Sequence, residues 1–210
     1  QQGYVGKGPL KNATVFLDFD DDGVKDANEP SVKTNDDGYF TITTTQSVYS
    51  IVAITDGGTI DASSGNVLDG IVLKATKDSS MVSPTTTLMK DSGLSAAAVK
   101  TILGLPDDYN PTTFNPYAAG ADATLALSIE KANHKIVSTI NTFSGALEGS
   151  GASATDAFTA SLEAFVEVIN DKQASSDTID LTNTTELDLI KLLFNFSILS
   201  FNLLMLFVFS

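Results

Sequence analysis

The chain has no cysteine and no arginine, and its only histidine is His134. The absence of cysteine excludes disulfide bonds, thiolate zinc sites and cysteine nucleophiles together. All twelve basic residues are lysines, so no guanidinium is available to clamp a phosphate with two parallel hydrogen bonds. One histidine supplies too few ligands for a zinc site. We therefore interpret His134 as a surface or partly buried helical residue, and not as part of a Ser–His–Asp triad.

Basic charge is also scarce. The formal net charge is −14 and the isoelectric point about 4.2, a balance that repels nucleic acid and attracts cations. The chain has none of the glycine-rich phosphate loops, GxSxG elbows or HExxH motifs that carry chemistry in many enzymes. It starts with Gln1-Gln2, with no basic and apolar leader ahead of it, so we expect a processed or excised piece of a longer protein. These absences favour a non-catalytic protein.

The remaining composition is that of a folded chain with two unlike halves, and it predicts an α+β protein. Residues 1–80 hold short runs of β-branched and aromatic residues between Gly and Asp turns, typical of a small β-sandwich. Residues 81–172 have the three- and four-residue apolar spacing of helices. Predicted strands cover 13–18, 39–44, 50–54 and 67–75. Predicted helices begin after the capping residues Ser83, Ser95, Asp122 and Ser153.

The C-terminal part divides again. Residues 173–191 are polar and predict a linker followed by a helix start. Residues 192–210 are uncharged and rich in Phe and Leu, and nineteen such residues are just enough to span a bilayer as a helix. Three interpretations of this tail stay open: a membrane anchor, an element buried in an assembly, or an artefact of the sequence.

The most specific motif is the acidic loop from Asp18 to Glu29. Its oxygen donors stand at the first, third, fifth, ninth and twelfth positions, with Gly23 at the sixth, which is the spacing of an EF-hand calcium loop. Alternating carboxylates wrap an ion that prefers six to eight oxygens, glycine permits the sharp turn, and the seventh position offers a carbonyl. Because the loop follows a strand, we expect a structural Ca²⁺ and not a sensor. The predicted ligands are Asp18, Asp20, Asp22, Val24 through its carbonyl, Asp26 and Glu29.

The segments 13–30 and 34–40 resemble the calcium-binding B-type domains of serine-aspartate-repeat adhesins, which are similar to collagen-adhesin B-type and transthyretin-like sandwiches. The resemblance covers about residues 8–55. It implies an immunoglobulin-like fold used as a stalk or spacer on bacterial cell surfaces, with the same six calcium ligands. The chain lacks the LPxTG-like sorting motif of that family. Segments 82–88, 93–95 and 103–106 resemble a helical region that follows such sandwiches in large secreted bacterial proteins.

The sequence thus predicts an extracellular, calcium-stabilised adhesive or structural module that binds other protein subunits or cell-surface ligands. Two alternatives stay open. One is a subunit of an extracellular filament or surface layer, with the apolar tail as its assembly element. The other is an accessory binding domain of a secreted enzyme. A second acidic segment, Asp56 to Asp61 with Asp69, matches no calcium-loop spacing and is interpreted as an ordinary turn.

Overall fold

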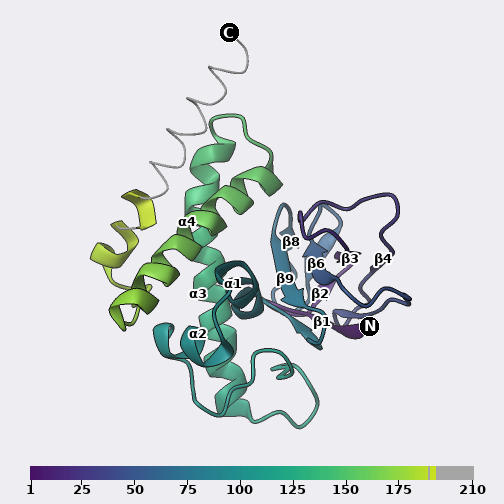
Figure 1. Ribbon diagram of the computed structural model, residues 1–210, viewed down its shortest axis with the longest axis horizontal. Helices are drawn as coiled ribbons and strands as arrows, with labels where there is room; N and C mark the ends of the chain where they lie inside the picture. The colour runs from purple at the N-terminus through teal and green to yellow at the C-terminus, as the bar shows by residue number, and fades with distance from the viewer. Residues whose placement is uncertain (189, 193–210) are drawn as a thin grey trace.

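The computed structural model describes residues 1–188 and 190–192 and shows an α+β protein (Figure 1). Strands fill the N-terminal part and helices follow, as predicted. The strands are β1 (Gln2–Val5), β2 (Leu10–Lys11), β3 (Thr14–Asp18), β4 (Ser31–Lys33), β5 (Tyr39–Thr41), β6 (Ser50–Ile54), β7 (Thr59–Asp61), β8 (Val67–Leu68), β9 (Val72–Thr76) and β10 (Met81–Val82). The helices are α1 (Pro84–Ser92), α2 (Ala96–Ile102), α3 (Ala123–Glu148) and α4 (Ala154–Ser175).

The strands form three small sheets. A four-stranded antiparallel sheet has the order β4-β3-β6-β9, and its two inner strands are almost wholly buried. Two three-stranded sheets have the orders β10-β1-β5 and β2-β7-β8. In the four-stranded sheet Asp18, the last residue of β3, lies opposite Ser50, the first residue of β6. This register places the start of the acidic loop at one end of a buried pair of strands.

All four predicted helix starts are confirmed. Each capping side chain accepts a backbone N–H in the first turn of its helix, as Asp122 Oδ1 does from Leu125 at 2.8 Å. Such caps satisfy N–H groups that have no partner inside the helix. Gly93 ends α1 in the left-handed conformation, with φ of 69°. The amphipathic stripe predicted for the long helix is also confirmed, since Ile129, Ile136 and Ile140 are buried.

Helix α1 joins the sheet to the other helices. The Thr85 hydroxyl donates to Asn133 of α3 at 2.8 Å, and the Thr86 hydroxyl donates to the carbonyl of Lys74 in β9 at 2.9 Å. Thr87 accepts the N–H of the same lysine at 2.9 Å. All three threonines are buried, and one continuous apolar core includes residues of both halves.

Two further features tie the halves together. Strand β10 follows the predicted boundary at residue 80 and pairs in parallel with β1, so the chain is still in the sheet region there. Gly70, with φ of 73°, passes so close to α4 that a Cβ would lie 2.6 Å from the Ala154 carbonyl carbon. Only glycine fits this contact and this backbone conformation. Figure 1 shows the helices stacked along one side of the strands.

The polar segment predicted as a linker packs against the helices. The Ile179 N–H donates to the carbonyl of Ile102 at 2.8 Å, and Ile179 and Ile190 are buried. Lys172 of α4 forms an ion pair of 2.7 Å with Glu186. Of the predicted apolar tail, 192–210, only Leu192 lies inside the described residues. Within the described part of the chain, no helix is both long and apolar enough to cross a membrane.

Candidate metal centre

Asp18 is the structural centre of the acidic loop. It ends the buried strand β3, and only 1% of its surface is exposed. Its two carboxylate oxygens accept the backbone N–H groups of Asp21, at 2.6 Å, and Gly23, at 2.8 Å. These bonds curl the chain around the carboxylate. The curl needs left-handed backbone at Asp21 and Gly23, whose φ angles are 67° and 77°. Gly23 is thus the glycine that the turn requires.

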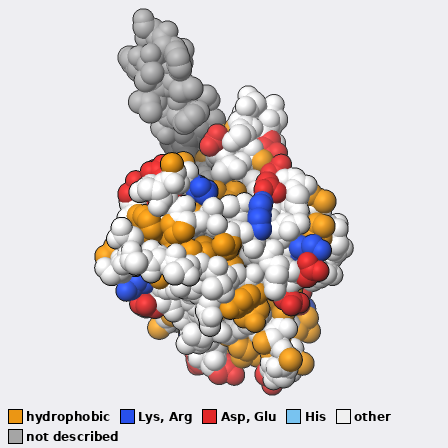
Figure 2. Space-filling model, turned by 90° about the vertical axis from the view of Figure 1, so that its right-hand side faces the viewer, with side chains coloured by type: hydrophobic (Ala, Val, Ile, Leu, Met, Phe, Trp, Pro, Cys, Tyr) orange, Lys and Arg blue, Asp and Glu red, His pale blue; other side chains and the backbone are white. Residues whose placement is uncertain are grey.

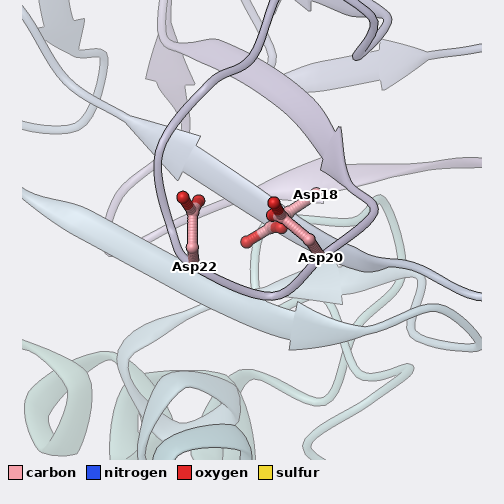
Figure 3. Close-up of side chains that lie close together, drawn as sticks. All are labelled: Asp18, Asp20 and Asp22. Carbon is pink, nitrogen blue, oxygen red and sulfur yellow. The ribbon is translucent and has the colours of Figure 1, made fainter.

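Two more carboxylates of the loop converge on Asp18. Asp18, Asp20 and Asp22 each offer an oxygen, and these three oxygens all lie within 4.8 Å of one another (Figure 3). Oxygens about 2.3–2.6 Å from a shared calcium ion are separated by at most about 5 Å, so the spacing fits a common ion. Asp20 and Asp22 are exposed to solvent, whereas Asp18 is buried. The structure therefore brings together three of the six predicted ligands.

The other predicted ligands stand outside this group. Glu29 is buried and closes the loop, because its oxygens accept the N–H groups of Phe19 at 2.7 Å and Asp26 at 2.9 Å. Asp26 and Val24 are exposed, and the Val24 N–H donates to Asp22 at 2.7 Å. A carboxylate oxygen has two lone pairs, so Glu29 retains acceptor capacity beside these bonds.

The electrostatics of the loop favour a cation. Burial raises the pKa of Asp18 above its ordinary value of 3.8, and the charges of Glu29 and Asp21 act in the same direction, against the backbone hydrogen bonds. In the described part of the chain no lysine lies within ion-pair distance of Asp18, Asp20 or Asp22. A divalent ion at this position would supply the missing positive charge.

Asp21 has a different role from its neighbours, which the sequence did not reveal. Its carboxylate accepts the Ser50 hydroxyl at 2.8 Å and pairs with Lys90 of α1 at 2.6 Å. Burial tends to raise the pKa of Asp21, but the hydrogen bonds from Lys90 and Ser50 and the charges of Lys90 and Lys74 outweigh it and leave the pKa lowered. Asp21 therefore belongs to the support of the loop and not to its group of converging oxygens.

The second acidic segment forms a turn that leads into strand β7. Asp56 accepts the N–H of Gly58 at 2.9 Å and pairs with Lys33 at 2.6 Å. Asp61 is buried, accepts from Ser63 and pairs with Lys7 at 3.0 Å. Among the described residues the Asp18 group is the only set of three or more metal-ligating side chains that converge. Residues 56–58 form a turn, as interpreted from the sequence, and residues 59–61 form strand β7.

His134 is exposed on α3, as predicted for a surface helical histidine. It shares the lining of a surface cleft of about 480 Å³ with Asp61 and Ser63. These three residue types are those of a hydrolytic triad, but the Ser63 hydroxyl donates to Asp61 at 2.6 Å. A nucleophilic serine must instead donate to the imidazole that removes its proton. The cleft therefore lacks the order of hydrogen bonds that this chemistry needs.

Comparison of the chain with protein-family models, with characterised proteins and with solved structures finds no match.

Proposed function

We propose that the chain is a non-catalytic extracellular module whose loop 18–29 binds one calcium ion that stabilises the fold. The observation that carries the proposal is the convergence of oxygens from Asp18, Asp20 and Asp22 at the end of a buried strand, with no lysine among them. Calcium coordinates oxygen alone and tolerates irregular geometry, which suits a loop of carboxylates and carbonyls.

In this proposal the calcium ion is coordinated by all six ligands that the spacing of loop 18–29 predicts. Asp18, Asp20 and Asp22 bind through carboxylates, and Val24 contributes its carbonyl. Asp26 and Glu29 complete the shell as the exposed part of the loop closes over the ion. The end of the loop at Glu29 is already held near its start by the bond to the Phe19 N–H at 2.7 Å, which limits the ordering that closure requires.

At the level of biology, we propose a structural or adhesive role at a bacterial cell surface, with protein subunits or surface ligands as partners. The support is the resemblance of residues 8–55 to adhesin B-type domains and the arrangement of short antiparallel strands in several sheets. We also propose that the strands form an immunoglobulin-like or transthyretin-like sandwich. A strongly acidic surface with a structural cation suits a setting where calcium is plentiful, since sites in extracellular modules bind calcium weakly, with dissociation constants of about 10⁻⁴–10⁻³ M.

The test is thermal unfolding of the chain in millimolar calcium and in chelator, together with titration calorimetry. We expect one calcium per chain and a higher midpoint with calcium, because a ligand that binds only the folded state stabilises it by mass action. In about 10 mM free calcium, which is about ten to one hundred times these dissociation constants, the stabilisation is about 1.4–2.7 kcal/mol. Magnesium at the same concentration should have a smaller effect, because it demands strict octahedral geometry. An unchanged midpoint with no heat of binding overturns the proposal.

A further inference from the structure

Loop 18–29 contacts the last turn of α1 in the helical half. Asp21 of the loop pairs with Lys90 of α1, with the carboxylate oxygen and the ammonium nitrogen 2.6 Å apart. The two residues are 69 positions apart in sequence. The same Asp21 carboxylate accepts the Ser50 hydroxyl of β6 at 2.8 Å. This one side chain therefore connects the loop to both the sheet and helix α1.

A second ion pair connects the sheet to the last turn of α1. Lys74 of β9 pairs with Asp91 of α1 at 3.1 Å, and both side chains are about four-fifths buried. The same lysine lies beside the loop, because a Cβ placed on Gly23 would be 3.8 Å from its ammonium nitrogen. The turn of the loop and the last turn of α1 thus border a common pair of lysines. These contacts lie outside the oxygens that converge on Asp18.

We propose that Asp21 and Lys90 anchor the calcium loop to helix α1, so that an ion bound in the loop also holds the end of α1 against the sheet. This inference rests on the proposed calcium site. Asp21 and Lys90 are positioning residues in it, since neither belongs to the converging group. An ion that orders the loop fixes the backbone of Asp21 between Asp20 and Asp22, and the pair with Lys90 then passes that order to the helix.

The charge of the loop still attracts Lys90 when calcium is bound. The loop carries six carboxylates and one lysine, so it keeps a net negative charge after a divalent ion binds. Lys90 is therefore still attracted to the loop when the ion is present. Asp21 has a left-handed backbone, with φ of 67°. Aspartate and asparagine tolerate this conformation better than most residues do, so either can occupy this position without added strain.

The experiment is hydrogen exchange, read at residues 18–29 and 88–92, on the full chain with calcium and with chelator. The variants are Lys90→Met and Asp21→Asn; asparagine retains an acceptor for Ser50 and the left-handed backbone. Lys33→Met is the matched control, because Lys33 forms an ion pair of the same 2.6 Å length with Asp56, outside the loop. Titration calorimetry on each variant reports binding independently of exchange.

In the wild type and in Lys33→Met, calcium is expected to slow exchange in both segments. In Lys90→Met and Asp21→Asn it should still slow the loop, but the slowing at 88–92 should fall by about two- to five-fold, the range for a solvent-exposed ion pair. The inference is wrong if calcium slows the loop alone in the wild type, or if the effect at 88–92 persists in both anchor variants. If the wild type neither binds calcium nor slows in the loop, the proposed function fails and takes the inference with it.

Discussion

Asp18 and Asp61 occupy nearly equivalent positions with opposite electrostatics. Each ends a strand, β3 or β7, each accepts a backbone N–H from the turn that follows it, and each is at most 2% exposed. Yet the pKa of Asp18 is raised and that of Asp61 is lowered. Burial raises the pKa of both, but at Asp61 the hydrogen bonds of Ser63 and the ammonium of Lys7 outweigh it.

The cation supplied by the protein makes the difference. Lys7 lies 3.0 Å from Asp61 and is itself mostly buried, so this carboxylate has a permanent counter-ion. Asp18 has two backbone N–H groups and two further carboxylates nearby, but no ammonium within ion-pair distance among the described residues. The turn after Asp61 is thus complete within the protein, whereas the turn after Asp18 is incomplete without a cation, and the placement of lysine decides which.

The largest expected effect comes from taking the counter-ion away from the complete turn. Lys7→Met leaves the Asp61 carboxylate buried without its ammonium, and we expect a loss of about 2–3 kcal/mol in the free energy of unfolding. Denaturant unfolding at neutral pH measures it. Lys33→Met removes an exposed pair from the turn that precedes β7 and should cost at most about 0.5–1 kcal/mol. Equal losses in the two variants would contradict the importance of burial at Asp61.

The next effect concerns the incomplete turn. Asp20→Asn removes one charged ligand from the converging group, and we expect calcium to bind at least about tenfold more weakly, which corresponds to about 1.4 kcal/mol. The matched control is Asp56→Asn, because the Asp56 carboxylate already has a lysine partner, Lys33. Its calcium affinity should stay within about twofold of the wild type. Calorimetric titration of both variants separates a specific loop from a general attraction of calcium to an acidic chain.

Local signals explain the parts of this structure that the sequence predicted. The caps at Ser83, Ser95, Asp122 and Ser153 act within three residues, so each helix start can be recognised from its own neighbourhood. The spacing of the acidic loop is local too, which is why it could point to Asp18, Asp20 and Asp22 together. The strand predicted at 50–54 has those limits in the structure, because a run of β-branched residues buried on both faces defines it.

Interactions across long sequence distances account for what was missed. Strands β1, β7 and β10 have two to four residues each, too few for a pattern, and their pairing partners define them. The lysine of Asp61 lies 54 residues away and that of Asp21 lies 69 residues away. Composition alone therefore gave no means to tell the complete turn from the incomplete one, or to find the anchor on α1.

The smallest expected effect is a difference in the sign of pH dependence, measured in chelator between about pH 3 and 6. A raised pKa in the folded state means that Asp18 stabilises the fold while protonated, below its ordinary value of 3.8, and that this contribution is lost as pH rises through its folded pKa. A lowered pKa means that Asp61 stabilises the fold above 3.8 and loses this contribution as pH falls through its folded pKa.

The two asparagine variants convert these signs into opposite slopes. As pH rises, the wild type should lose stability relative to Asp18→Asn and gain stability relative to Asp61→Asn, whatever constant offset the lost hydrogen bonds add to each. Calcium provides the decisive contrast, because it replaces the proton at Asp18 and has no place at Asp61. With calcium present, the loss relative to Asp18→Asn should turn into a gain, while the slope against Asp61→Asn stays the same. Slopes of equal sign in chelator would show that the two buried carboxylates are not electrostatic opposites and that the Asp18 carboxylate does not need an added cation.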